Sequence, residues 1–142
     1  MVSINTLKNL FWLFILFLIL VGCEQQVTAP PESFQVTGTL AVQTLDDLGL
    51  PLSVPVIFKT FHNIGNQETS MIQTDSVTLI SNQQGWVEFS QTVELEGQEY
   101  FSILSDVSSP QYQSRNYWTA YFQSVDAPAK RMEVQMVVVR KH

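Results

Sequence analysis

Apolar and polar residues alternate with a period of two from Phe34 onward, and this alternation constrains the fold more than any other feature. Phe34, Val36, Leu40 and Val42 are apolar and are separated by polar or small residues. Such alternation is typical of a β-strand with one buried face. Comparable stretches, separated by turn-forming residues, predict seven strands near residues 34–43, 54–58, 70–81, 86–95, 100–105, 115–123 and 132–140. We therefore expect an all-β fold, a seven-stranded antiparallel β-sandwich.

The N-terminal segment is apolar but short. Lys8 precedes an unbroken apolar run over residues 10–21. As a helix this run would rise only ~18 Å, whereas the hydrocarbon core of a bilayer is ~30 Å thick. The run therefore fits a cleaved signal peptide better than a spanning anchor. The alternative, a short membrane anchor that ends in a cysteine, is disfavoured because the polar residues Glu24-Gln25-Gln26 follow at once.

The apolar run ends in Leu20-Val21-Gly22-Cys23, and Cys23 is the only cysteine of the chain. This tetrapeptide resembles the lipobox of bacterial lipoproteins. The resemblance implies that the chain is cut before Cys23, that its thiol carries a diacylglyceryl group and that the new amine is acylated, by chains such as palmitate. Two or more acyl chains make attachment to a membrane stable. Glu24 replaces the aspartate that retains many such proteins in the inner membrane, which favours the outer membrane.

We expect three segments along the chain: a signal peptide over residues 1–22, the lipidated Cys23 with an extended tether to residue 33, and a sandwich domain over residues 34–142. Pro30-Pro31 and their polar neighbours keep the tether extended, to at most ~33 Å. No cysteine other than Cys23 is present to form a disulfide, so the domain must be stabilised by its apolar core.

The predicted mature chain is acidic. It carries thirteen acidic and six basic residues, a net charge of −7, and no Lys or Arg lies between Lys59 and Arg115. Nucleic-acid binding needs clustered positive charge, so we exclude a nucleic-acid partner. The acidic residues fit solvated strand edges and turns better than an acidic docking surface.

Several spacings taken together resemble the carboxypeptidase-regulatory-like domain, whose fold is a transthyretin-like or Ig-like β-sandwich. The resemblance covers about two thirds of the predicted mature chain and implies a non-catalytic binding or scaffolding module. Its residues are Val36-x-Gly38-x-Leu40, Asp47-x-Gly49-x-Pro51-Leu52-x-Val54-x-Val56, Ser81-Asn82-x-x-Gly85-x-Val87-x-Phe89 and Leu95-x-Gly97-x-x-Tyr100-x-x-Ile103.

Residues suited to catalysis or metal binding are scarce. The histidines are His62 and the terminal His142, and no G-x-S-x-G motif is present to accompany them. Zinc requires three or four Cys, His or carboxylate ligands in one place. Glu94 and Glu96 share a strand face but fit an exposed face better than a catalytic pair. We therefore expect no enzyme activity, no catalytic residues, no metal site and no cofactor.

An aromatic segment over residues 115–123 is the best candidate for a contact surface. If it is a strand, Trp118, Ala120 and Phe122 face the core, and the opposite face carries two tyrosines. The predicted ligand or partner face, here called the aromatic face, consists of Tyr117, Tyr121, Arg115 and Gln123. Aromatic rings beside amide and guanidinium groups suit a glycan or a protein. The alternative is that these tyrosines simply cover a sheet face.

Asp75-Ser76-Val77 resembles the acceptor motif for O-glycosylation in the envelope proteins of some Bacteroidetes-type bacteria, which makes Ser76 a candidate modification site. Three residues form a motif that often arises by chance.

Together these features predict a non-catalytic, lipid-anchored binding or accessory module of the cell envelope, at the outer membrane. Its expected partners are the membrane, through lipid on Cys23, and an envelope protein or glycan. One alternative is a structural subunit of an envelope machine, such as the outer-membrane lipoprotein of type VI secretion, to whose second strand residues 53–59 are loosely similar. Another is a small envelope hydrolase that uses His62, or an inhibitor of such an enzyme.

Overall fold

The computed structural model describes residues 32–64 and 71–142, and within them the chain folds into strands with one short 3-10 helix. This part of the chain contains eight strands, whereas the sequence predicts seven. They and the helix are β1 (Ser33–Leu45), β2 (Pro55–Asn63), β3 (Met71–Ile80), β4 (Trp86–Glu96), β5 (Tyr100–Val107), β6 (Tyr112–Ser114), β7 (Trp118–Gln123), η1 (Ser124–Asp126) and β8 (Ala129–Arg140).

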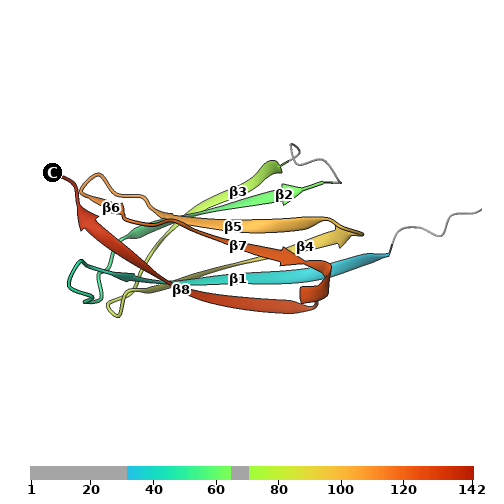
Figure 1. Cartoon of the computed structure of the whole chain (residues 1–142), viewed down its shortest axis with the longest axis horizontal. Helices are drawn as coiled ribbons and strands as arrows, with labels where there is room; N and C mark the ends of the chain where they lie inside the picture. The colour runs from blue at the N-terminus through green and yellow to red at the C-terminus, as the bar shows by residue number, and fades with distance from the viewer. Residues whose placement is uncertain (1–31, 65–70) are drawn as a thin grey trace, which may run out of the picture. The chain divides into compact units, whose positions relative to one another are not determined.

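The strands form two four-stranded sheets that pack face to face as a β-sandwich (Figure 1). One sheet has the order β4-β1-β8-β6 and the other the order β3-β2-β5-β7. The predicted β-sandwich is thus confirmed. Its short connections come from turn residues such as Gly49, Gly85 and Gly97, each of which has a positive φ.

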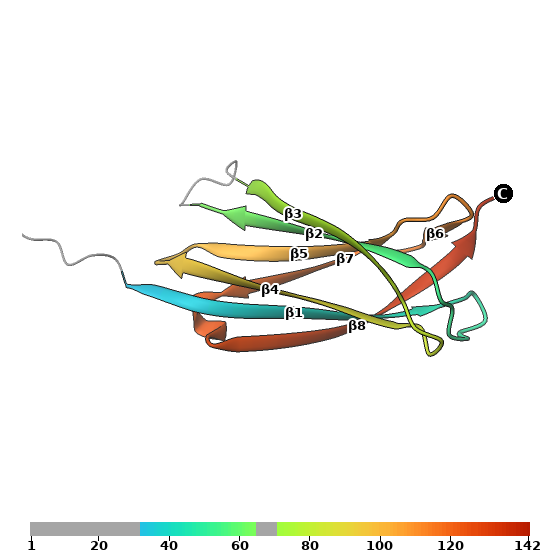
Figure 2. The ribbon, with the colours of Figure 1, turned by 180° about the vertical axis from the view of Figure 1, so that it is seen from behind.

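The prediction of a wholly antiparallel sandwich is wrong at one place. β1 and β8 run parallel, from Thr37 opposite Ala129 to Leu45 opposite Val137 (Figures 1 and 2). Parallel neighbours need a long connection, and here almost the whole domain lies between the two strands. Alternation reports which face of a strand is buried, but it carries no information about the partner or its direction.

The strand missing from the sequence prediction is β6, which has only three residues. Alternation over three residues is too short to recognise. β6 pairs with the end of β8 in one sheet, and the chain then crosses to β7 in the other. Because of this crossing, residues 115–117 lie outside any strand, and β7 begins at Trp118 instead of at Arg115.

The core lies between the two sheets and receives alternate side chains from both. Its largest buried members are three phenylalanines, of which Phe101 and Phe122 stack with ring centroids 4.9 Å apart. Together with the aliphatic residues they form a single cluster. Its buried members are Val36, Leu40, Val42, Val54, Val56, Phe58, Leu95, Phe101, Ile103, Ala120, Phe122, Met136 and Val138.

Buried hydroxyl groups join the end of β1 to two loops. The Thr44 hydroxyl contacts the carbonyl oxygens of Leu52 and Gly85 at 2.6 and 3.0 Å and the Ser81 hydroxyl at 2.9 Å. The Ser81 oxygen in turn accepts a hydrogen bond from the backbone N–H of Val54 at 2.9 Å. Buried polar groups are tolerated when they are hydrogen-bonded, so this cluster fixes the loops against β1.

The N-terminal features lie outside the described residues. This holds for the signal peptide over residues 1–22, for Cys23 and for most of the tether, and their roles stay predictions. β1 begins at Ser33, so the last residue assigned to the tether belongs to the sandwich. Among the described residues no helix is long and apolar enough to cross a membrane.

Candidate functional site

The structure distributes the aromatic face over two kinds of segment. Tyr121 and Gln123 are exposed on β7, which is an edge strand. Tyr117 is 69% exposed, and both it and Arg115 lie in the link between β6 and β7. The four residues are therefore not aligned along one strand, and their role in ligand or partner contact stays a prediction.

Tyr121 contacts a neighbouring strand of its own sheet. Its ring lies edge-on to that of Tyr100, with the centroids 6.0 Å apart. The Tyr100 hydroxyl accepts a hydrogen bond from the amide nitrogen of Asn63 at 2.9 Å. These contacts fit tyrosines that cover the outer face of the sheet, and Tyr121 still exposes 53% of its surface.

The expectation that Trp118 faces the core is wrong, whereas the burial of Ala120 and Phe122 is confirmed. Trp118 is 40% exposed, and its indole N–H donates to the carbonyl oxygen of Gln135 at 2.8 Å. The reason is the crossing between the sheets, which places Trp118 at the first position of β7. There its indole covers the edge of β8 and satisfies a backbone acceptor.

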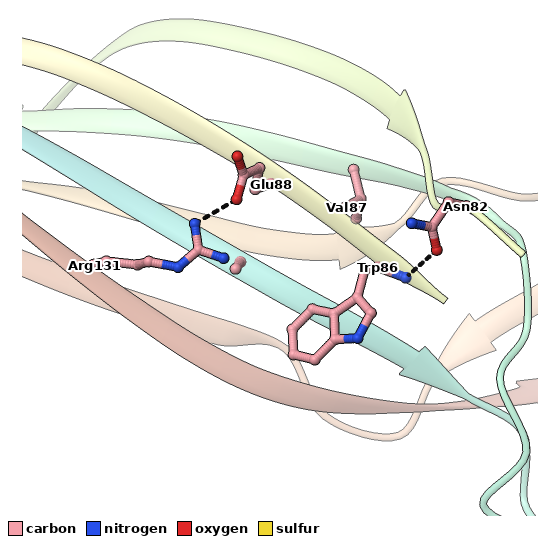
Figure 3. Close-up of a pocket in the computed structure, with 6 residues that line it drawn as sticks. Asn82, Trp86, Val87, Glu88 and Arg131 are labelled. Atoms are coloured by element: carbon pink, nitrogen blue, oxygen red, sulfur yellow. Dashed lines mark hydrogen bonds and ion pairs between the residues drawn. The ribbon is translucent and has the colours of Figure 1, made fainter. Parts of the chain in front are cut away.

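A shallow pocket of about 270 Å³ lies on the outer face of the sheet that contains β1 (Figure 3). We call it the Trp86 pocket. Its floor is Ala41, which is only 1% exposed although its neighbours in β1, Leu40 and Val42, are the residues that face the core. The pocket is lined by Ala41, Asn82, Trp86, Val87, Glu88 and Arg131.

Strand register explains why this pocket forms. Ala41 lies opposite Glu88 of β4 on one side and Glu133 of β8 on the other. A small residue between two longer side chains leaves a depression in the face of the sheet. In Figure 3 the Trp86 indole and the Arg131 guanidinium both project over the ribbon of β1. Ala41 of this strand is one of the residues that line the pocket.

Ion pairs hold the charged groups of the Trp86 pocket. Arg131 pairs with Glu88 through one terminal nitrogen and donates from Nε to Glu133 at 3.1 Å. The hydrogen bond to Glu88 and then that to Glu133 raise the pKa of Arg131 above its ordinary value. The guanidinium is therefore held across β1, from β8 to β4.

Neutral polar groups complete the rim of the pocket. The Asn82 side-chain oxygen accepts hydrogen bonds from the backbone N–H groups of Gln84 and Trp86, each at 2.9 Å. The amide oxygen of Gln43, next to Trp86 in the register, accepts a hydrogen bond from Gln135 at 3.1 Å. Within the described residues, the Asn82 amide nitrogen and the Trp86 indole nitrogen have no hydrogen-bond partner, so both can donate to a ligand.

Sequence reasoning missed the Trp86 pocket, although part of its signal was present. Alternation places Trp86 and Glu88 on one strand face. The position of Ala41 beside them depends on the β1–β4 register, and that of Arg131 on the parallel β1–β8 pairing. Neither pairing can be inferred from a single strand.

A second pocket, of about 340 Å³, lies at the end of the domain where β1 begins. It is lined by the β4–β5 turn, by Gln123 of the aromatic face and by Ser124. His62 lies close to the same turn, with Nε2 3.5 Å from a carboxylate oxygen of Glu99. This carboxylate also accepts the backbone N–H of Glu96 at 3.0 Å, which makes it part of the turn.

The candidate modification site and the candidate carboxylate pair lie on strands at the surface. Ser76 is exposed on the edge strand β3, and O-glycosylation there stays a prediction. Glu94 accepts a hydrogen bond from the Ser33 hydroxyl at 2.7 Å, and Glu96 lies exposed at the end of β4. In the part of the chain that the structure describes, no three His, Cys, Asp or Glu side chains are grouped as a metal site.

No protein-family model matches the chain, so the resemblance to the carboxypeptidase-regulatory-like domain stays a prediction. No curated protein matches it either. Among solved structures, the chain is similar to an alternative pilotin from the type II secretion system of Vibrio cholerae, with 12% identity and a TM-score of 0.43 over 78% of this chain and 99% of the pilotin. It is also similar to a D295N mutant of the shaft pilin SpaA from Lactobacillus rhamnosus GG, with 14% identity and a TM-score of 0.38 over 78% of this chain and 49% of the pilin. Likeness at this level does not establish a family.

Proposed function

We propose that this chain is a lipid-anchored, non-catalytic binding or accessory module of the bacterial cell envelope, attached to the outer membrane. The observation that carries the proposal is the tetrapeptide Leu20-Val21-Gly22-Cys23, which ends a short apolar run with the only cysteine of the chain. An acylated Cys23 would hold the domain at a membrane surface without a spanning helix.

The distance from Cys23 to the domain supports this arrangement. The first strand, β1, begins at Ser33, ten residues after Cys23. Ten residues reach at most ~33 Å, so the domain would stay close to the membrane and still be free to turn. Within the sandwich, the C-terminus lies at the end opposite the start of β1 (Figure 1).

The side chains that could contact a partner support a binding role. The Trp86 pocket and Tyr121 of the aromatic face are accessible on the outer faces of different sheets. Glu88 of the Trp86 pocket and the neighbouring Glu133 are paired with Arg131, and Glu99 beside His62 accepts a backbone N–H. A general base needs a free, oriented acceptor near a reacting group, which these arrangements do not favour.

Replacement of Cys23 tests the anchor. We expect Cys23→Ser to abolish the incorporation of radiolabelled palmitate, to leave the chain uncleaved and to remove it from the outer-membrane fraction, because the thioether cannot form. The matched control is Ser33→Ala, which should leave labelling and fractionation unchanged. Palmitate labelling that survives in Cys23→Ser would overturn the proposal.

A structural subunit of an envelope machine is the second candidate, and the edge strand β3 favours it. β3 runs for ten residues and pairs with β2 on one side. No described residue pairs with its other edge, and on the faces of the strand Ile72 is 54% and Ile80 72% exposed. Edge strands are usually protected by charge, proline or short length, yet β3 contains only Asp75 as a charge and no proline. An open edge of this kind accepts an extended segment of a protein partner as an added strand.

Site-specific photo-crosslinking in living cells distinguishes this candidate. A crosslinking amino acid at Gln73 in β3 should give one stoichiometric adduct with an envelope protein, because an added strand would contact that position. The same amino acid at Gln35, exposed on the face of the other sheet, should give none. Absence of a discrete adduct at Gln73 would eliminate the subunit role and leave the lipid anchor unaffected.

A further inference from the structure

The Trp86 pocket combines a flat aromatic side chain with planar hydrogen-bonding groups. Its lining includes the Trp86 indole and the Asn82 amide, and Arg131 pairs with Glu88 beside them (Figure 3). A pyranose ring has one face of C–H groups, which packs against an aromatic ring, and a rim of hydroxyls. These hydroxyls form hydrogen bonds with amide, carboxylate and guanidinium groups.

The size of the pocket suits one sugar ring. Its volume of about 270 Å³ lies just below the range of roughly 300–1,000 Å³ that is typical of sites for drug-sized ligands. Ala41 is only 1% exposed, so a ring in the pocket would contact the side chains around this small residue rather than its methyl group. The Arg131–Glu88 pair bounds the pocket on the side of Thr39, and short side chains continue along β1 and β4 beyond this pair. Their hydroxyls pair across the strands, Thr39 with Ser90 at 2.8 Å and Thr37 with Thr92 at 2.9 Å.

The ion pairs of Arg131 favour the binding of a neutral ligand over that of an ionic one. Arg131 is the cation of the pocket, and it already binds Glu88 and Glu133. An anion would compete with two carboxylates for this guanidinium, and a cation would compete with the guanidinium for the carboxylates. The uncharged donors, Asn82 and Trp86, have no hydrogen-bond partner among the described residues and are available to hydroxyl groups.

From this geometry we infer that the Trp86 pocket binds a neutral pyranose ring of a glycan, with the ring stacked on Trp86. Asn82 and Arg131 donate to its hydroxyls, and Glu88 accepts from them. The inference goes beyond the proposed lipid anchor and does not depend on it, because the pocket belongs to the sandwich alone.

Saturation-transfer NMR on the full chain in detergent tests the inference with named sugars. The probes are the methyl pyranosides of glucose, galactose and N-acetylglucosamine, with glucuronate as the anionic comparator. A single ring of about a dozen non-hydrogen atoms is expected to bind with a Kd of about 1 mM. At least one neutral pyranoside should therefore receive saturation, and glucuronate should bind at least tenfold more weakly.

Two variants of the pocket and one matched control locate the binding. Trp86→Ala removes the stacking surface, and Ala41→Val fills the floor without removing a polar group. Each should weaken binding at least tenfold. Trp118→Phe changes an exposed tryptophan outside the pocket and should leave binding within twofold. Thermal melts verify that each variant is folded. If Trp86→Ala is unfolded, the sugar binding of Ala41→Val decides whether the pocket is the binding site.

The inference is overturned if none of the three pyranosides receives saturation, if binding survives both pocket variants, or if glucuronate binds as well as the neutral sugars. Each of these outcomes leaves the lipid anchor untouched, since palmitate labelling of Cys23 is measured separately. Conversely, the Cys23→Ser variant should bind sugar as the unchanged chain does, although it cannot be acylated at position 23.

Discussion

Gly85→Ala is expected to lower the free energy of unfolding by about 3 kcal/mol or more, which is a large fraction of the 5–15 kcal/mol that stabilises a typical domain. Gly85 has a φ of +77°, a conformation that costs a residue with a side chain about 1–2 kcal/mol. In addition, a Cβ at this position would lie 2.3 Å from the backbone oxygen of Thr44. Thr44 cannot move away, because its N–H donates to the Gly85 oxygen at 2.9 Å and its hydroxyl belongs to the buried cluster with Ser81. Forced overlap in a packed region adds about 1–3 kcal/mol.

Gly97→Ala is the matched control for this effect. Gly97 also has a positive φ, +57°, but a Cβ there would have no atom within 4 Å. Only the conformational cost applies, so we expect a loss of about 1 kcal/mol. Urea denaturation of both variants measures the difference. Equal losses would show that the contact with Thr44 contributes nothing and that the loop after β3 relaxes freely.

Gly38→Ala is expected to cost about 2 kcal/mol through overpacking of the core. Gly38 lies in β1 beneath the stacked rings of Phe101 and Phe122. A Cβ there would lie 2.6 Å from Phe122 Cγ and 2.8 Å from Phe101 Cζ. Both rings are fully buried, so neither has space into which it can move. Alanine also reduces the entropy of the unfolded chain, which offsets about 0.4–1 kcal/mol of a cost of about 1–3 kcal/mol.

A double-mutant cycle tests this explanation directly. Phe122→Leu makes the ring side chain smaller and costs about 1 kcal/mol alone. If Gly38 is required because the ring occupies the space above it, the double variant should be at least about 1 kcal/mol more stable than the sum of the single effects predicts. Additive losses, measured by chemical denaturation, would mean that Gly38 is needed for another reason.

Each predicted strand corresponds to an observed one, because burial of one face leaves a period of two in the residues. The alternation predicts a strand over residues 86–95, and β4 spans Trp86–Glu96. It predicts another over residues 70–81, and β3 spans Met71–Ile80. The errors occur where tertiary structure overrides a local pattern. Trp118 continues the apolar face of Ala120 and Phe122 in the sequence, but the crossing between the sheets turns it out toward Gln135.

Some candidate sites can be predicted from local sequence, and others depend on the tertiary structure. Contiguous residues predict lipidation of Cys23, which lies outside the described residues. Alternation predicts Tyr121 as an exposed aromatic residue of a strand face, and its exposure is confirmed. The Trp86 pocket depends on three strands and one turn, with Ala41 and Arg131 ninety residues apart in the chain and adjacent in space. No pattern within one segment could have indicated that they share a pocket.

Residue order alone determined the all-β class and the positions of the longer strands, and it also contains the tetrapeptide that resembles a lipobox. Each of these features depends only on residues that are adjacent in the sequence: on alternation, on turn residues or on a short peptide. The parallel pairing of β1 with β8, the exposure of Trp118 and the Trp86 pocket were decided only by the packing of the two sheets. Pairing energy arises between strands that are distant in the chain, and a strand presents the same alternating face to every partner.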